Sequence, residues 1–265
     1  MEIAFWGVRG DIPVPEASLG VYGGNTLCFS ANVNENEAVI FEAGTGLLDC
    51  FDTLAPEHLL PECTDIFLSS YRPEHIQSIP FLSSMYISKN KVRFCGPSTA
   101  AGGVNRSLGI LVRKCFCPVP NFFDEEDVGA EIEFLEMANG SVRSGSLTIS
   151  SYPLAHKDGT ISLCWRIDDN SNGKFMSYIP DIYDLNYFKE ARANIPDNFF
   201  GADLLLLGIC SDNYDLALLQ ELANLFKSSR MVFWQYGAEA SDEVINSCEC
   251  DKIMAAREGM IINLC

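Results

Sequence analysis

Basic residues are scarce in this sequence. Lys and Arg together number 18, against 36 Asp and Glu, so the formal net charge is −18. A field of that sign repels polyanions, which argues against DNA or RNA as a general partner. A small anionic ligand held in a local positive pocket is compatible with the same composition.

Long hydrophobic runs are also absent. No stretch of 18 consecutive apolar residues occurs, so the sequence predicts no membrane-spanning helix. The first ten residues, MEIAFWGVRG, have neither the basic segment nor the apolar core of a secretory signal. We expect a cytoplasmic protein without a membrane partner. A protein partner is a further possibility, and the oligomeric state stays open.

Zinc-finger and disulfide patterns are missing although the chain has eleven cysteines. An odd number of cysteines without a secretory signal predicts reduced thiols. The pairs Cys115/Cys117 and Cys248/Cys250 have C-x-C spacing, which does not indicate a structural zinc site. A thiol-based redox sensor is one hypothesis, but nothing in the sequence locates a thiol with a lowered pKa.

No repeat, low-complexity tract or Pro/Ser-rich linker interrupts the chain, so we predict a single domain over residues 1–265. Short apolar runs bounded by turn residues predict strands, and the continuous apolar run at 202–209 predicts a buried one. The other predicted strands are 3–6, 26–33, 38–43, 65–70, 91–97, 147–154, 160–167, 174–180, 230–236 and 259–264.

Helices are predicted at four places, and one long segment shows no regular pattern. Apolar residues recur at helical spacing over 215–229, and weaker patterns occur at 47–54 and 76–86. Ser241 is a plausible N-cap for a helix that follows it. Residues 97–130 are predicted to be irregular. Two strand-rich halves with helices between and after them indicate an α/β fold of two sheets with helices on their outer faces.

Several sequence blocks resemble one known family. FWGVRGDIPVP, YGGNT and FEAGTG occur in that order and resemble the opening of a bacterial branch of the metallo-β-lactamase-fold hydrolases. The resemblance implies a four-layer αββα sandwich, with two mixed sheets packed face to face and helices outside. It also implies a pair of metal ions that activate water for hydrolysis of phosphodiesters or related esters.

The metal signature of that family is altered here. The stretch SSYRPEHIQSIPF, residues 69–81, falls where the family has His-x-His-x-Asp-His followed by Ile-Gln-Gly-Leu-Pro-Phe. Ser70 and Arg72 stand at the first two His positions, Glu74 replaces the Asp, and His75 is unchanged. A permanent guanidinium cation at such a position would repel an incoming metal ion.

Three further blocks extend the resemblance. YPLAHKDGT is similar to the block that would make His156 a retained ligand, and YIPDIYD to the one that supplies the bridging carboxylate, Asp181. In VFWQYGAEASDE, Trp234 or Gln235 occupies the position of the last His. Glu42 stands where the family has an aspartate in its third block.

These replacements predict a remnant site rather than a two-ion centre. The resemblance places Ser70, Arg72, His156 and Asp181 at the first ion, where two of four ligands are lost. It places Glu74, His75, Asp181 and the last-His position at the second ion. We therefore expect no cofactor or one weakly bound divalent metal, with remnant ligands among Glu74, His75, His156 and Asp181. Gln235 could offer it a carbonyl oxygen.

The sequence allows three interpretations of Arg72. It could be a solvated turn residue, an internal partner of Asp181 in a bidentate pair, or a receptor for a ligand phosphate or carboxylate. The alternative interpretation of His75 is a helix-start or core histidine, and that of Asp181 is a turn residue.

The leading hypothesis is a degenerate, inactive or impaired relative of these hydrolases that binds a ligand or a protein. Arg72 and Tyr236 are the candidate ligand-binding residues. The alternative is a single-metal, phosphodiesterase-like hydrolase in which Asp181 and His75 are catalytic.

Overall fold

The computed structural model describes residues 1–14, 20–34, 36–54, 61–98, 107–115, 128–212 and 214–265. Its strands form two mixed sheets of seven strands each. The first sheet has the order β14 (Ile261–Asn263), β1 (Glu2–Gly7), β2 (Cys28–Ala31), β3 (Glu37–Phe41), β4 (Cys63–Phe67), β5 (Lys91–Pro97) and β6 (Glu131–Met137). The second has the order β13 (Ile253–Ala255), β12 (Met231–Tyr236), β11 (Leu204–Ser211), β10 (Phe175–Ile182), β9 (Ile161–Asp169), β8 (Leu147–Ala155) and β7 (Gly140–Ser144).

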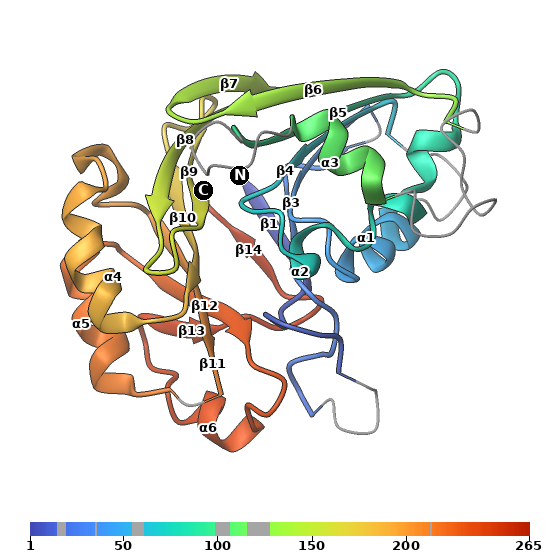
Figure 1. Ribbon diagram of the computed structural model, residues 1–265. Helices are drawn as coiled ribbons and strands as arrows, with labels where there is room; N and C mark the ends of the chain where they lie inside the picture. The colour runs from blue at the N-terminus through green and yellow to red at the C-terminus, as the bar shows by residue number, and fades with distance from the viewer. Residues whose placement is uncertain (15–19, 35, 55–60, 99–106, 116–127, 213) are drawn as a thin grey trace.

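Helices cover the outer faces of both sheets, as Figure 1 shows for α1 and α3 on the first sheet and α4 and α5 on the second. The α-helices of the described residues are α1 (Gly46–Leu54), α2 (Pro73–Ile76), α3 (Leu108–Cys115), α4 (Leu185–Ala191), α5 (Leu216–Phe226) and α6 (Asp242–Asn246). Short 3₁₀ helices are η2 (Ile79–Phe81), η3 (Ser83–Tyr86), η6 (Arg192–Asn194) and η7 (Asp197–Phe199). None of the helices in the described ranges is long and apolar enough to cross a membrane.

The layers follow from the alternation of side chains along the strands. In β3, Val39 and Phe41 belong to the core between the sheets, whereas Ala38 and Ile40 belong to a second core under the helices. The strand β11 lies between parallel neighbours β10 and β12, and its run of leucines is buried throughout. This pattern confirms the prediction of two mixed sheets packed face to face with helices outside.

Two local predictions were wrong. The pattern over 76–86 gives α2 and two 3₁₀ helices instead of one helix, because Pro80 has no N–H to donate within a continuous helix. Within the segment predicted to be irregular, residues 108–115 form α3, whose Leu108 and Val112 pack into the core under the first sheet. Residues 124–127, the acidic sequence DEED, lie outside the described residues.

The thiols in the described residues are all free. Burial raises the pKa of several of them: the pKa of Cys95 rises to about 12, and those of Cys28 and Cys164 are also raised. A thiol with a raised pKa is a poor nucleophile at neutral pH. These buried cysteines therefore give no support to the redox-sensor hypothesis.

Candidate functional site

The candidate site lies where the carboxyl ends of strands from both sheets meet. Glu42 follows β3, His75 lies in the short helix after β4, and Asp181 and Gln235 lie near the ends of β10 and β12. All four side chains are fully buried. The site therefore joins the two sheets through polar groups, at the strand ends where α/β proteins commonly bind ligands.

His75 bridges two carboxylates. Its Nδ1 lies 2.6 Å from Glu42 Oε2, and its Nε2 lies 3.0 Å from Asp181 Oδ1. A carboxylate can only accept, so both ring nitrogens donate and the ring is an imidazolium. Burial lowers the pKa of His75, but the charges of Asp181 and Glu42 outweigh burial and hold it well above its ordinary value.

Glu42 is enclosed by donors. Its carboxylate accepts from the backbone N–H of Ser69 at 3.1 Å, from Tyr178 Oη at 3.0 Å, and from the Ser69 hydroxyl. The Ser69 hydroxyl in turn accepts from Trp165 Nε1 at 2.9 Å. From the sequence, Glu42 was identified only as a residue at the position of a family aspartate. Its contact with Tyr178 of the second sheet could not be predicted from sequence spacing.

Asp181 is held by Gln235 as well as by His75. Gln235 Nε2 donates to Asp181 Oδ1 at 2.7 Å, and the Asp181 backbone N–H donates to Gln235 Oε1 at 2.9 Å. The Ser162 hydroxyl donates to Asp181 Oδ2. Burial raises the pKa of Asp181, but His75 and these hydrogen bonds lower it well below its ordinary value.

Of the two residues that compete for the last-His position, the fold brings Gln235 to the site. Trp234 instead packs between the sheets, with ring-centroid distances of 5.8 Å to Phe5 and 5.5 Å to Tyr178. Successive side chains of a strand point to opposite faces, so only one of the pair can reach Asp181.

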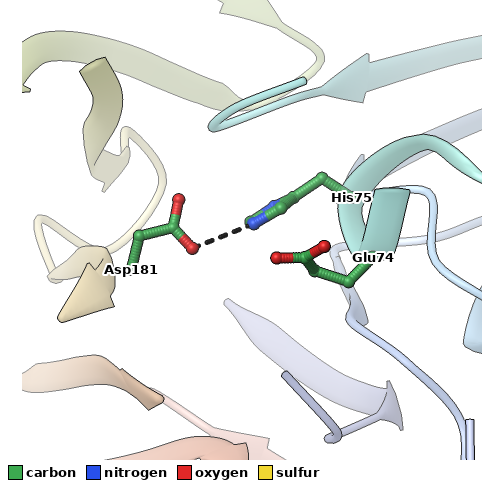
Figure 2. A group of neighbouring side chains, drawn as sticks. All are labelled: Glu74, His75 and Asp181. Carbon is green, nitrogen blue, oxygen red and sulfur yellow. Dashed lines mark hydrogen bonds and ion pairs between the residues drawn. The ribbon is translucent and has the colours of Figure 1, made fainter. Parts of the chain in front are cut away.

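Glu74 completes a group with His75 and Asp181. One ligand atom from each of the three lies within 4.8 Å of the others, and Figure 2 shows the Glu74 carboxylate beside the imidazole and turned toward Asp181. Burial raises the pKa of Glu74. Among the described residues, its carboxylate accepts a hydrogen bond from Tyr183 Oη at 3.3 Å, and that hydroxyl is shared with Asp181 Oδ1 at 3.3 Å.

His156 is near this group but not part of it. Its Nε2 lies 2.8 Å from the Ser162 hydroxyl. Because Ser162 gives its own proton to Asp181, His156 Nε2 must donate to Ser162, and that nitrogen has no lone pair left for a metal. Burial lowers the pKa of His156, which keeps the ring neutral.

The backbone is strained at three of these positions. Glu42, Asp181 and Gln235 have φ angles of 66°, 59° and 72°, in the left-handed region that residues other than glycine rarely adopt. Such strain persists where the surrounding structure enforces it, and it is concentrated at functional sites. The chain therefore keeps the geometry that directs these three side chains toward the site.

Comparison with solved structures places this architecture among known folds. The chain is similar to a diphosphatase of the PhnP family, with a TM-score of 0.69, 12% identity, and coverage of 99% of this chain and 97% of that one. It is also similar to YhfI, a metallo-β-lactamase-fold protein from Bacillus subtilis, with a TM-score of 0.65, 12% identity and 99% coverage of each chain. This chain has the metallo-β-lactamase fold. Human tRNase Z, short form, matches with a TM-score of 0.59, 15% identity and 99% coverage of each chain.

Sequence comparison adds no family assignment. No family model matches the sequence. No curated protein matches it either. The metallo-β-lactamase fold is therefore established by structure.

The residues present do not fit the two-ion centre that this fold implies. Ser70 and Arg72 offer no imidazole, and His156 Nε2 is engaged with Ser162. Gln235 directs its carbonyl oxygen at the Asp181 backbone N–H and its NH₂ group at the Asp181 carboxylate, so a donor rather than an acceptor faces that carboxylate. The donor set of Glu74, His75 and Asp181 could hold one ion.

Arg72 lies at the mouth of the site and does not form the bidentate pair with Asp181, so that interpretation was wrong. Its guanidinium lies over the Tyr183 ring, 4.3 Å from the centroid. Nη2 contacts Asp158 Oδ2 at 3.4 Å and Thr160 Oγ1 at 3.3 Å. The side chain is 31% exposed, so it can reach a ligand.

A pocket of about 360 Å³ opens beside Arg72. We call it the Arg72 pocket. Asp181 and His156 lie on its wall, whereas Glu74 and His75 do not line it. Its lining consists of Arg72, Leu154, Ala155, His156, Lys157, Asp158, Asp181, Ile182, Tyr183, Asp184, Tyr187, Phe188 and Ala191.

Tyr236 does not line this pocket. Its side chain is fully buried, and its hydroxyl lies 3.0 Å from the Phe233 carbonyl and 2.9 Å from the Ala256 carbonyl. The structure therefore gives Tyr236 a role in the core, in contrast to the ligand-binding role predicted from the sequence.

Proposed function

We propose that this chain is a degenerate metallo-β-lactamase-fold protein that has lost two-ion hydrolysis and acts by binding a small anionic ligand in the Arg72 pocket. The observation that carries the proposal is the Arg72 guanidinium, placed at a former metal-ligand position and held over Tyr183 at the pocket mouth. Its contacts with Asp158 and Thr160 use one nitrogen, Nη2, at the long end of hydrogen-bond distances. A phosphate or carboxylate could accept two parallel hydrogen bonds from the planar Arg72 guanidinium, at shorter distances than these.

The rest of the pocket favours a ligand with an apolar body. Leu154, Ile182 and Phe188 line it together with the charged residues. A second hollow of about 440 Å³ shares Leu154, Ala155, Tyr187 and Ala191 with it and continues between β8 and α4. The ligand class that fits is an elongated molecule with one phosphate or carboxylate at Arg72 and an aryl or alkyl part along Tyr187.

The test is binding of phenyl phosphate, measured by calorimetry with the wild-type chain and with Arg72→Gln. We expect at least tenfold weaker binding by the variant, because the guanidinium that would bind the anion is removed. Arg143→Gln is the matched control, since Arg143 is exposed and lines a different pocket. Equal affinity of all three proteins, or no binding by any, would count against the proposal.

A second candidate function is favoured by the group of Glu74, His75 and Asp181. If that group held one divalent ion, the ion would lower the pKa of a bound water for phosphodiester hydrolysis. Turnover of bis(p-nitrophenyl) phosphate with Mn²⁺, Zn²⁺ or Mg²⁺, abolished by His75→Ala, would support it. Elemental analysis of untagged protein purified without chelators separates the two: one equivalent of metal would favour the single-metal hydrolase, and two equivalents would contradict the degenerate site.

A further inference from the structure

We propose that Gln235 is a positioning residue that holds Asp181 where a metal ion would otherwise hold it. The proposal goes beyond ligand binding at Arg72 and rests only on the loss of the two-ion centre. It concerns what keeps a buried carboxylate in place when the cations are gone.

The orientation of the Gln235 amide is fixed by the structure. The Asp181 backbone N–H lies 2.9 Å from Oε1, and an N–H can face only the oxygen end of the amide. The NH₂ end must then face Asp181 Oδ1, at 2.7 Å. Gln235 therefore presents a donor to the carboxylate and has no acceptor directed at a cation there.

The Asp181 oxygens are already engaged by the protein. Oδ1 accepts from His75 Nε2 and Gln235 Nε2, with the Tyr183 hydroxyl at 3.3 Å, and Oδ2 accepts from the Ser162 hydroxyl. A carboxylate has about four lone-pair positions, so these donors occupy most of them. A metal ion that bound Asp181 at one of these occupied positions would displace a donor, which would then be left buried without a partner.

The surrounding backbone leaves space for the Gln235 side chain. Gly208 lies beside Gln235 in the neighbouring strand, and a Cβ at that position would collide with Gln235 Oε1. The register of β10 and β11 shifts between Ile179 and Ile182, where Asp181 turns inward. Glycine and the irregular register therefore place the amide against Asp181.

The decisive variant is Gln235→Glu, which replaces the NH₂ donor with an acceptor of nearly the same shape. Without metal we expect a lower melting temperature, because two carboxylates then face each other. With Mn²⁺ or Zn²⁺ we expect the melting temperature to rise and the affinity for the ion to exceed that of the wild type at least tenfold. The introduced carboxylate would join Glu74, His75 and Asp181 as a fourth ligand once His75 Nε2 has released its proton to solvent.

Gln77→Glu is the matched control. Gln77 is close to His75 in sequence and donates to Thr26 Oγ1, outside the group of carboxylates. This variant should lose stability without any rescue by Mn²⁺ or Zn²⁺. The wild type should show no shift in melting temperature with either ion or with EDTA.

Two results would overturn the proposal. One is micromolar binding of Mn²⁺ or Zn²⁺ by the wild type, because Gln235 would then not be occupying the place of the ion. The other is a Gln235→Glu variant that folds and gains no metal response. If that variant does not fold, the wild-type titration decides alone. The calorimetric test of the proposed function measures phenyl phosphate binding without metal. Its failure is therefore distinguishable from a failure of the Gln235 proposal, which is measured by metal binding.

Discussion

At the scale of single residues, His75 decides the electrostatics of the site. It is fully buried between Glu42 and Asp181, and its pKa is held well above the ordinary value by their charges. Removing one partner of a buried charged network leaves the other charges uncompensated. Near pH 6 we expect His75→Gln to lower the free energy of unfolding by about 3–5 kcal/mol.

This contribution should depend on pH. A group whose pKa is raised in the folded state stabilises it fully below its unfolded pKa, about 6.5 for His, and less as pH rises through the folded pKa. Asp181 has the opposite sign: its pKa is lowered in the folded state, so its contribution disappears as pH falls through and below the ordinary range of Asp. The wild type should therefore lose its advantage over His75→Gln in alkaline solution.

Urea unfolding of both proteins from pH 6 to pH 10 measures the difference. Groups that do not interact with His75 titrate equally in the two chains, so their effects cancel. A difference that stays constant or grows toward pH 10 would show that His75 is not an imidazolium in the folded protein.

At the scale of elements, helix caps and strand ends account for much of what is predictable. The helix α6 begins after Ser241, as the sequence predicted, and the Ser241 hydroxyl accepts from the Val244 N–H at 3.4 Å. The strongest helical pattern became α5, whose N-cap is Asp215, with its carboxylate accepting from the Ala217 N–H at 2.9 Å. Caps of this kind depend on neighbours in the chain, which is why spacing reveals them.

The Asp215 cap gives a direct prediction. We expect Asp215→Ala to lower the free energy of unfolding by about 1 kcal/mol, because an N–H at the start of α5 loses its acceptor. Chemical denaturation measures the change. The control is Asp251→Ala, an exposed aspartate in a turn outside the helices, which should have little effect. Equal losses in the two variants would contradict the capping role.

The errors at this scale have a common cause. The run over 76–86 has apolar residues at suitable spacing, but its buried side chains pack in 3₁₀ turns against the first sheet. Conversely, α3 is short, and its two buried residues, Leu108 and Val112, gain their stability from tertiary packing. Local periodicity does not contain that information.

At the scale of the whole molecule, the net charge of −18 is the dominant long-range feature. Like charges repel across the surface, and salt screens them over about 8–10 Å at ionic strengths of 0.10–0.15 M. We expect the melting temperature to rise as NaCl increases from 10 to 300 mM. His75→Gln should show a similar increment, because the buried network is screened much less than the surface. A falling melting temperature would mean that attractive surface pairs outweigh the repulsion.

The sequence by itself determined the two-sheet fold, because strand periodicity is a local property of the chain. The replacement of metal ligands is a prediction that the ordered motifs carry through their resemblance to one family. Only the tertiary structure decided that Gln235 rather than Trp234 reaches Asp181, that Glu42 lies against His75, that Arg72 lies over Tyr183, and that Tyr236 is in the core. The physical reason is that these contacts join strands from distant parts of the chain. Strand pairing, register shifts and left-handed backbone angles set where such side chains point, and spacing along the sequence does not record them.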